Sequence, residues 1–204
     1  MRRELLMVFV KNPITGKVKT RLAATVGNEA AFAVYQNLLE YTLQITSPVK
    51  TKKIVFYSDF IPESDTWRKS GFQQELQTGL ELGERMMNAF HYAFENKYSK
   101  VVLIGCDCLE INTDLLNHAF EKLNEFYLVI GPATDGGYYL LGINRLHGDF
   151  FRNKIWGSAS VYRDTIQDTH RLELSTFNLP VLNDIDEEKD LTYSLRLLTK
   201  SVTL

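Results

Sequence analysis

The sequence has little that would suit a membrane span or a nucleic-acid partner. None of its apolar runs approaches the ~20 residues that a membrane-spanning helix needs, and residues 1–4 lead directly into an apolar segment rather than a signal sequence. Its 23 Lys and Arg residues nearly balance its 25 Asp and Glu residues, which gives a formal net charge of −2. Since no overall field recruits nucleic acid or an anionic membrane, we expect a cytoplasmic protein.

Cysteine and histidine are also scarce. The two cysteines, Cys106 and Cys108, are separated by one residue, and alternation along a strand would send their side chains to opposite faces. A disulfide between them is therefore not expected. The four histidines are scattered along the chain, which argues against a zinc site. We interpret both cysteines as small buried apolar residues.

Strand-like apolar segments alternate with helical segments along the chain. Of the 204 residues, 45% are apolar, enough for one sizeable core, and no repeat or linker divides residues 1–204, so we expect a single domain. Strands are predicted at residues 5–10, 54–58, 72–77, 101–104, 126–131, 138–142 and 172–179. Helices are predicted at residues 28–46, 64–71, 84–98, 113–124, 161–169 and after 191. This order predicts an α/β fold, a three-layer α/β/α sandwich around a mostly parallel central sheet.

The apolar run 101–104 ends close to Asp107, which small side chains flank. Such a run suits a strand covered on both faces, as in a parallel sheet, and ligands collect at the carboxyl ends of those strands. An Asp at that point can hold a divalent cation against nucleotide phosphates, because Mg²⁺ shares its shell among carboxylates, water and phosphate. The alternative is that Asp107 only caps the following turn.

A loop rich in cations follows the first predicted strand. Lys11, Lys17, Lys19 and Arg21 lie within eleven residues, beside turn-forming residues that include Gly16. Lys and Arg bind phosphate through charge-assisted hydrogen bonds, so the loop suits a phosphate chain, although it matches neither the P-loop nor the dinucleotide glycine motif. We expect this loop to be exposed and flexible. A solvated basic loop without a ligand is the alternative.

Two further segments combine glycines with polar residues. Gly79 and Gly83, four residues apart, precede a predicted helix; here the structural alternative is that Gly83 permits close packing and Arg85 is an exposed charge. The turn 135–137, Asp-Gly-Gly, lets backbone approach a ligand without a Cβ in the way. On the sequence alone, an ordinary Asp-Gly hairpin is the favoured interpretation of that turn.

Acidic residues precede the last predicted helix. Asp184 and Asp186 are two residues apart just before the helix starts. Acidic residues in that place usually compensate the helix dipole. The alternative is that one of these carboxylates points at a metal ion.

Five motifs, in this order and over nearly the whole chain, resemble a known family. They are Phe9-Val10-Lys11-x-Pro13-x-x-Gly16-x-Val18-Lys19-Thr20-Arg21-Leu22, Leu82-Gly83-Glu84-Arg85-Met86, Gly105-x-Asp107-Cys108, Gly131-Pro132-Ala133-x-Asp135-Gly136-Gly137-Tyr138 and Asp184-Ile185-Asp186-x-x-x-Asp190-Leu191. Together they resemble the bacterial GT-A-type family of glycosyltransferase-like, selenodomain-associated transferases. The basic element at 19–22 is also similar to that of phospholactate guanylyltransferase. In one departure from the family, Leu109 replaces the usual Pro after Asp-Cys, and Glu110 follows where Asp is more usual.

The resemblance implies the GT-A, or nucleotide-diphospho-sugar transferase, fold, with a nucleotide between the first loop and the central strand. It implies Mg²⁺ or Mn²⁺ on Asp107, with a second ligand from Asp186 or Asp184. The candidate catalytic residues are then Lys19, Arg21 and Asp107. The candidate nucleotide-binding residues are Lys11, Gly16, Lys19, Arg21, Gln77, Gly83 and Arg85. The acceptor side would be lined by Asp135, Gly136, Gly137 and Tyr138.

The leading interpretation is a metal-dependent transferase that uses an activated nucleotide, with glycosyl transfer from a nucleotide-sugar donor to a small-molecule acceptor. The first alternative is a nucleotidyltransferase acting on a nucleoside triphosphate and a small phosphorylated or sugar acceptor, because both reactions need charge stabilised on phosphate oxygens. The second is a catalytically silent nucleotide-binding module. A receiver-like signalling domain would place an acidic pair after the first strand, where this chain has a basic loop.

Overall fold

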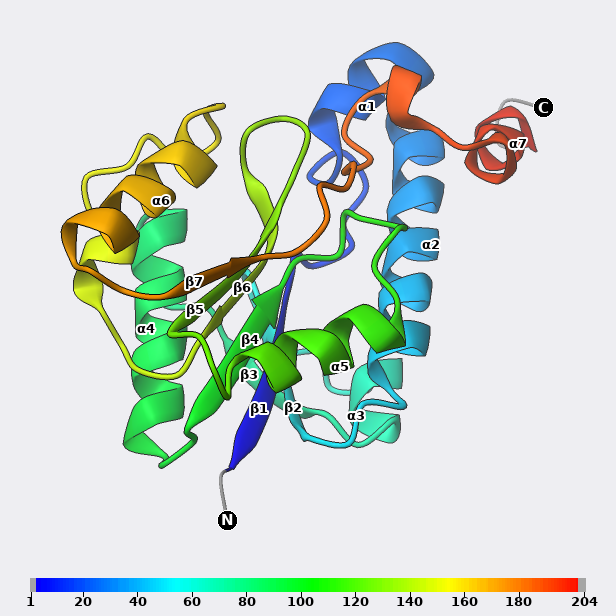
Figure 1. Cartoon of the computed structure of the whole chain (residues 1–204). Helices are drawn as coiled ribbons and strands as arrows, with labels where there is room; N and C mark the ends of the chain where they lie inside the picture. The colour runs from blue at the N-terminus through cyan, green and yellow to red at the C-terminus, as the bar shows by residue number, and fades with distance from the viewer. Residues whose placement is uncertain (1–2, 202–204) are drawn as a thin grey trace.

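The computed structural model describes residues 3–201, which form a seven-stranded sheet with helices on both faces (Figure 1). The strands are β1 (Glu4–Val10), β2 (Lys52–Tyr57), β3 (Gln73–Leu76), β4 (Lys100–Ile104), β5 (Leu128–Pro132), β6 (Tyr138–Ile143) and β7 (Thr176–Asn178). The helices are α1 (Thr20–Val26), α2 (Asn28–Thr46), α3 (Thr66–Lys69), α4 (Leu82–Glu95), α5 (Thr113–Lys122), α6 (Val161–Arg171) and α7 (Tyr193–Ser201), with 3-10 turns η1 (Gly148–Phe151) and η2 (Glu188–Asp190). This arrangement confirms the predicted three-layer sandwich.

The strand order in the sheet is β3-β2-β1-β4-β6-β5-β7. All neighbouring strands are parallel except β6, which runs antiparallel to both β4 and β5. The carboxyl ends of β1, β4 and β5 therefore meet the start of β6 at one edge of the sheet. Receiver-like domains have the all-parallel order 2-1-3-4-5, so this topology excludes that alternative.

Alternate residues of each central strand point to opposite faces of the sheet and pack into separate apolar cores. In β1, Leu6 and Val8 pack on the face covered by α2, α3 and α5, whereas Leu5 and Met7 pack on the face covered by α4, η1 and α6. Figure 1 shows α4 and α6 on one side of the sheet and α2 and α5 on the other. Burial on both faces holds the sheet rigid, which fixes the positions of the loops at its edge.

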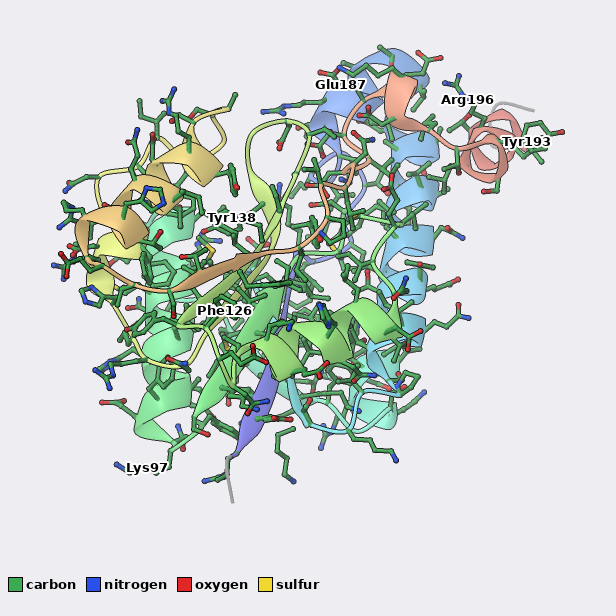
Figure 2. The ribbon with its side chains drawn as sticks, in the orientation of Figure 1. Lys97, Phe126, Tyr138, Glu187, Tyr193 and Arg196 are labelled. Carbon is green, nitrogen blue, oxygen red and sulfur yellow. The ribbon has the colours of Figure 1, made fainter. Side chains whose placement is uncertain are left out.

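The carboxyl-terminal segment is attached by a third apolar cluster. Ile185 and Leu191 pack with Leu22 of α1 and Leu38 of α2. Tyr193 lies outside that cluster and projects from α7, 80% exposed (Figure 2). This packing brings residues near the end of the chain next to the basic loop near its start.

The structure differs from the predicted elements at two places. Helix α1 begins at Thr20, inside the loop that was expected to be irregular, and α2 follows it directly after Gly27. Strand β7 has three residues rather than the predicted 172–179. Leu172 and Leu174, which suggested a longer strand, instead pack onto the core beneath α4 and α6.

The expectation for the two cysteines was right about burial and wrong about geometry. Both are free and buried, as predicted. Strand β4 ends at Ile104, so Cys106 and Cys108 lie in the loop beyond it, and both side chains join the same core cluster rather than opposite faces. None of the helices within residues 3–201 is long and apolar enough to cross a membrane.

Candidate functional site

A cavity of about 580 Å³ lies at the sheet edge where β1, β4 and β5 end. The predicted site residues that line it are Lys11, Lys19, Arg21, Gln77, Asp107, Asp135, Gly137, Tyr138, Asp184 and Asp186. Four predicted residues are not among its lining residues: Gly16, Gly83, Arg85 and Gly136. The cavity is thus built from segments at both ends of the chain, which the sheet topology brings to one edge.

The side chain of Lys19 occupies the centre of the charged part of this cavity. Its Nζ lies 2.5 Å from Oδ1 of Asp107 and 3.0 Å from Oδ1 of Asp186. Only 5% of the Lys19 side chain is exposed. The expectation of an exposed, flexible loop is therefore wrong for Lys19, because two carboxylates from distant segments bury and pair its ammonium.

The electrostatic surroundings keep Lys19 charged. Burial disfavours the ammonium, but the adjacent carboxylates of Asp107 and Asp186 outweigh that effect and raise the pKa of Lys19 above its ordinary value. The backbone of Lys19 is left-handed, with φ 47° and ψ 45°, at the N-cap of α1. A left-handed Lys is uncommon and its strain must be offset by surrounding contacts, here the ion pairs of its side chain.

Asp107 is positioned by both its backbone and its side chain. Its carbonyl accepts a hydrogen bond from the N–H of Ile185 at 2.8 Å. Among the described residues its carboxylate pairs with Lys19. The side chain of Asp107 is 43% exposed. The bond to Ile185 places the neighbouring Asp186 beside Asp107, and the N–H of Asp186 donates in turn to the carboxylate of Asp190 at 3.1 Å.

Arg21 adds a second cation at a greater distance. Its Nη1 lies 3.8 Å from Oδ2 of Asp186, and 64% of its side chain is exposed. An exposed pair at that distance contributes little to stability. The guanidinium therefore remains available for an anion that enters the cavity.

Asp184 lies deeper than its neighbours. Its Oδ1 is buried without a hydrogen-bond partner among the described residues. Burial, together with the negative charges of Asp107, Asp135 and Asp186, raises the pKa of Asp184 from 3.8 to about 7. Asp184 therefore exchanges its proton near neutral pH, unlike an ordinary carboxyl.

The predicted metal ligands meet part of what a divalent ion requires. Carboxylate oxygens are the ligands that Mg²⁺ and Mn²⁺ prefer, and those of Asp107 and Asp186 converge on one point. That point is held by the ammonium of Lys19, and no three His, Cys, Asp or Glu side chains within residues 3–201 are grouped closely enough to hold a metal ion. The donor chemistry fits the ion, and the metal assignment stays a prediction.

The start of the basic loop is held by Tyr35, a residue that no sequence motif singled out. Its hydroxyl accepts a hydrogen bond from the N–H of Lys11 at 2.8 Å and donates one to the carbonyl of Lys11 at 2.9 Å. The thiol of Cys106 also donates to this hydroxyl, at 3.5 Å. Tyr35 thus joins the ends of β1 and β4 under the cavity.

Gln77 and Arg85 form a structural pair at the side of the cavity. Gln77 Nε2 donates to the carbonyls of Val10 and Phe56, both at 3.0 Å, which ties the ends of β1 and β2 together. Arg85 Nε donates to the carbonyl of Gly79 at 3.1 Å, and its Nη1 reaches Oε1 of Gln77 at 3.5 Å. Gln77 lines the cavity, whereas Arg85 supports it from behind.

Two of the predicted glycines have packing roles, and a third serves a turn. A Cβ on Gly83 would lie 2.2 Å from Nε1 of Trp156, and a Cβ on Gly136 would lie 2.2 Å from the carbonyl oxygen of Ala159. Gly16 has a φ of 79° and ordinary contacts with its neighbours, so it serves the turn. The close-packing alternative is therefore supported for Gly83 and also applies to Gly136.

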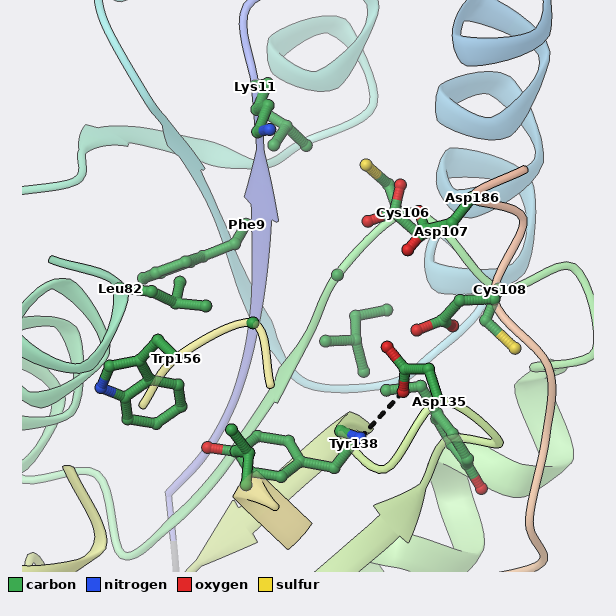
Figure 3. Close-up of a pocket in the computed structure, with 18 of the residues that line it drawn as sticks. Phe9, Lys11, Leu82, Cys106, Asp107, Cys108, Asp135, Tyr138, Trp156 and Asp186 are labelled. Carbon is green, nitrogen blue, oxygen red and sulfur yellow. Dashed lines mark hydrogen bonds between the residues drawn. The ribbon is translucent and has the colours of Figure 1, made fainter. Parts of the chain in front are cut away.

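The turn at 133–137 is both an ordinary turn and part of the cavity. Asp135 Oδ1 accepts a hydrogen bond from the N–H of Gly137 at 2.8 Å, the pattern of an Asx turn. Asp135 and Tyr138 line the cavity (Figure 3). Trp156 lines it as well, although no motif in the sequence singled it out.

The fold and the site define a class of protein. A mostly parallel sheet with an antiparallel β6, and a cavity at the ends of β1 and β4, is a GT-A-like nucleotide-diphospho-sugar transferase fold. The chain belongs to the family described as "Uncharacterized protein conserved in bacteria (DUF2064)", whose profile matches residues 42–158. No curated protein matches the chain.

Solved structures confirm the resemblance to GT-A-type transferases. A candidate nucleotide-diphospho-sugar transferase from Desulfovibrio desulfuricans G20 is 32% identical, with a TM-score of 0.85 over 100% of this chain and 96% of that chain. The inositol-1-phosphate CTP transferase from T. maritima is 13% identical, with a TM-score of 0.52 over 99% of this chain and 96% of that one. Glucosyl-3-phosphoglycerate synthase from Mycobacterium tuberculosis, solved with Mn²⁺ and uridine-diphosphate, is 14% identical. Its TM-score is 0.55 over 99% of this chain and 77% of that one. The fold is therefore shared with both glycosyl- and nucleotidyltransferases.

Proposed function

We propose that this protein is a Mg²⁺- or Mn²⁺-dependent transferase that uses an activated nucleotide, and that it transfers a glycosyl group from a nucleotide sugar. One observation carries the proposal: a buried ammonium, that of Lys19, is held between the carboxylates of Asp107 and Asp186 inside the cavity. Burying the ammonium of Lys19 is costly and needs compensation, which the two partly exposed carboxylates provide. A phosphate-binding and metal-binding site provides a reason to maintain such a cluster.

The cations of the cavity bind the phosphates of the donor. Lys19 and the exposed Arg21 neutralise the leaving phosphate through charge-assisted hydrogen bonds, and Asp107 and Asp186 are the residues that hold the divalent ion. When bound, that ion would supply further positive charge near the phosphates, which would lower the barrier by roughly several kcal/mol. Lys11, whose backbone is held by Tyr35, also lines the cavity and adds to the positive potential around the phosphates.

The transfer step takes place between the phosphate cluster and the turn at 133–137. The hydroxyl oxygen of the acceptor forms a bond to the anomeric carbon of the sugar. The bond from that carbon to the diphosphate oxygen breaks, and its electron pair leaves with the diphosphate. Asp135, on the acceptor side, accepts the hydroxyl proton, which is the role of a general base.

Nucleotidyl transfer from a nucleoside triphosphate is the second candidate. The exposed guanidinium of Arg21 favours it, because an additional phosphate would find a partner there. The fold is compatible, since the CTP transferase from T. maritima shares it. A catalytically silent nucleotide-binding module is the remaining alternative.

A thermal-shift panel tests the proposal. Nucleotide sugars, nucleoside diphosphates and nucleoside triphosphates are each added with and without Mn²⁺ to the native protein and to Asp107→Asn. A ligand at a hundred times its Kd stabilises the native state by about 2.7 kcal/mol. For a domain of this size that corresponds to a rise in Tm of roughly 5–10 °C.

We expect a rise in Tm that requires Mn²⁺ and disappears in Asp107→Asn. Nucleotide sugars and nucleoside diphosphates should give the largest shifts. Larger shifts with triphosphates would favour nucleotidyl transfer. Binding without turnover of any sugar or nucleotidyl group would favour the silent module. A flat panel with folded protein would contradict the nucleotide-dependent function altogether.

A further inference from the structure

The part of the cavity away from the carboxylates is apolar. Its wall consists of Phe9, Leu82, Met86, Leu103, Tyr138 and Trp156. In Figure 3, Phe9, Leu82, Trp156 and Tyr138 stand on one side of the cavity, and Asp107 and Asp186 stand on the other. The cavity therefore has two chemically different halves.

The aromatic wall is preformed rather than loosely arranged. Two glycines allow the segment that carries Trp156 to pack closely. Gly83 packs against the indole and Gly136 against Ala159, and neither position has space for a Cβ atom. The ring of Trp156 meets the ring of Tyr138 edge to face, with 6.4 Å between centroids. Rings fixed in this way present an apolar surface at little cost in side-chain entropy on binding.

The charges around this wall are unfavourable for an anion. Among the described residues that line the cavity, the cations are Lys11, Lys19 and Arg21, and none of them comes from α4, β6 or the segment 152–160 that build most of the wall. The charged group on the adjoining turn is the carboxylate of Asp135. One of its oxygens accepts from Gly137, and a carboxylate has further lone pairs with which to accept a hydrogen bond from a ligand.

We infer that the apolar half binds the acceptor, and that the acceptor is an uncharged alcohol with an aromatic or apolar carbon skeleton rather than a phosphorylated sugar. This inference rests on the proposed transferase function. The skeleton packs against Trp156 and Tyr138, and the hydroxyl donates to Asp135. A phosphate in this half would be desolvated next to Asp135 without a cation, which is strongly unfavourable.

Binding of simple probes tests the inference on the full chain. Phenyl β-D-glucopyranoside is an uncharged alcohol with an aromatic ring, methyl β-D-glucopyranoside lacks the ring, and glucose 6-phosphate carries the charge. The protein has two tryptophans; Trp67 is buried against Phe72, whereas Trp156 lines the cavity. We expect the phenyl glucoside at millimolar concentration to change the Trp156 emission, and calorimetry to show binding at least about tenfold tighter than for either other probe.

Variants locate the binding to the wall. Trp156→Leu should weaken phenyl glucoside binding about tenfold, whereas Trp156→Phe, which keeps a ring, should retain most of it. Ile155→Ser is the matched control, because Ile155 is the neighbouring residue, 76% exposed, and is not a lining residue. The affinity of Ile155→Ser for the phenyl glucoside should equal that of the native protein.

Several results would overturn the inference. They are equal binding of glucose 6-phosphate or methyl glucoside, no signal with the phenyl glucoside, or an unchanged affinity in a folded Trp156→Leu. Failure of the transferase proposal is separately visible. If the phenyl glucoside binds as expected while the nucleotide panel is flat, the apolar subsite stands and the nucleotide-dependent function does not.

Discussion

The ammonium of Lys19 lies 2.5 Å from the carboxylate of Asp107, in the position that a divalent cation would need in order to use that carboxylate. The same ammonium reaches Asp186 at 3.0 Å. The cluster thus carries its own counter-ion. A metal ion that binds there must displace Lys19 from the carboxylates, and the released ammonium is then free to pair with phosphate.

Removing the ammonium should therefore strengthen metal binding. In Lys19→Met the two carboxylates lose their internal competitor, so we expect Mn²⁺ to bind the nucleotide-free protein about tenfold or more tightly, a gain of about 1.4 kcal/mol. Without Mn²⁺, the variant should be less stable than the native protein, because two neighbouring carboxylates remain unpaired. Isothermal titration with Mn²⁺ and thermal melts measure both effects.

Arg21→Met is the matched control for that experiment. Arg21 is largely exposed, so its removal should change the free energy of unfolding by no more than about 0.5 kcal/mol. It should also leave Mn²⁺ affinity nearly unchanged. Weaker Mn²⁺ binding in Lys19→Met than in the native protein would show that Lys19 does not compete with the ion.

The raised pKa of Asp184 predicts a particular dependence of stability on pH. The folded protein keeps the proton of Asp184 up to a pKa of about 7, whereas the unfolded chain loses it near 3.8. Between these values the native state binds more protons, so this group lowers stability as pH rises, with a slope of at most about 1.4 kcal/mol per pH unit. Above about pH 7 its contribution is constant.

Asp184→Asn should remove that dependence. Urea unfolding in EDTA at about pH 5 and about pH 8 should show that the native protein loses more stability between the two pH values than the variant does. An amide cannot ionise, so the free energy of unfolding of the variant should exceed that of the native protein most at the higher pH. Identical pH profiles for the two proteins would show that the Asp184 carboxyl ionises normally.

The two hydrogen bonds between Tyr35 and Lys11 lead to a third prediction, which concerns stability. Tyr35→Phe leaves the N–H and the carbonyl of Lys11 without the partner they share, which should cost about 1–3 kcal/mol. The control is Tyr41→Phe, in which a single bond to the carbonyl of Ile111 is lost and the cost should be about 1 kcal/mol or less. Chemical denaturation measures both, and equal losses of stability would show that Tyr35 does not hold the backbone of Lys11 in the way described.

The strands and their layer arrangement were predictable because their signal is local. Val101 to Ile104 is an unbroken apolar run, and such a run occurs in strands that are covered on both faces. Asp107 and Asp135 were also identifiable, because each follows a predicted strand and so falls at the sheet edge. The antiparallel direction of β6 within a mostly parallel sheet followed from the short turn that joins it to β5.

The features that were not predictable depend on contacts between distant segments. A lysine is normally exposed, and nothing near Lys19 in the sequence indicates that it is buried; Asp107 and Asp186 bury it. For Gly83 the sequence left both a nucleotide loop and close packing open, and only its contact with the indole of Trp156, from a distant segment, decides for packing. Tyr35 has no local mark at all, because a buried tyrosine on a helix is usually part of the core.

The pair formed by Lys19 and Asp186 joins residues 167 positions apart. Contacts over such separations carry a high entropic cost of closure and form late in folding. The sheet from β1 to β6 is complete in sequence before residue 186 is reached, so a nascent chain can hold most of its core while its charge cluster is still open. The site becomes whole only when the segment around Asp186 packs against α1 and α2, which couples competence for binding to the docking of that late segment.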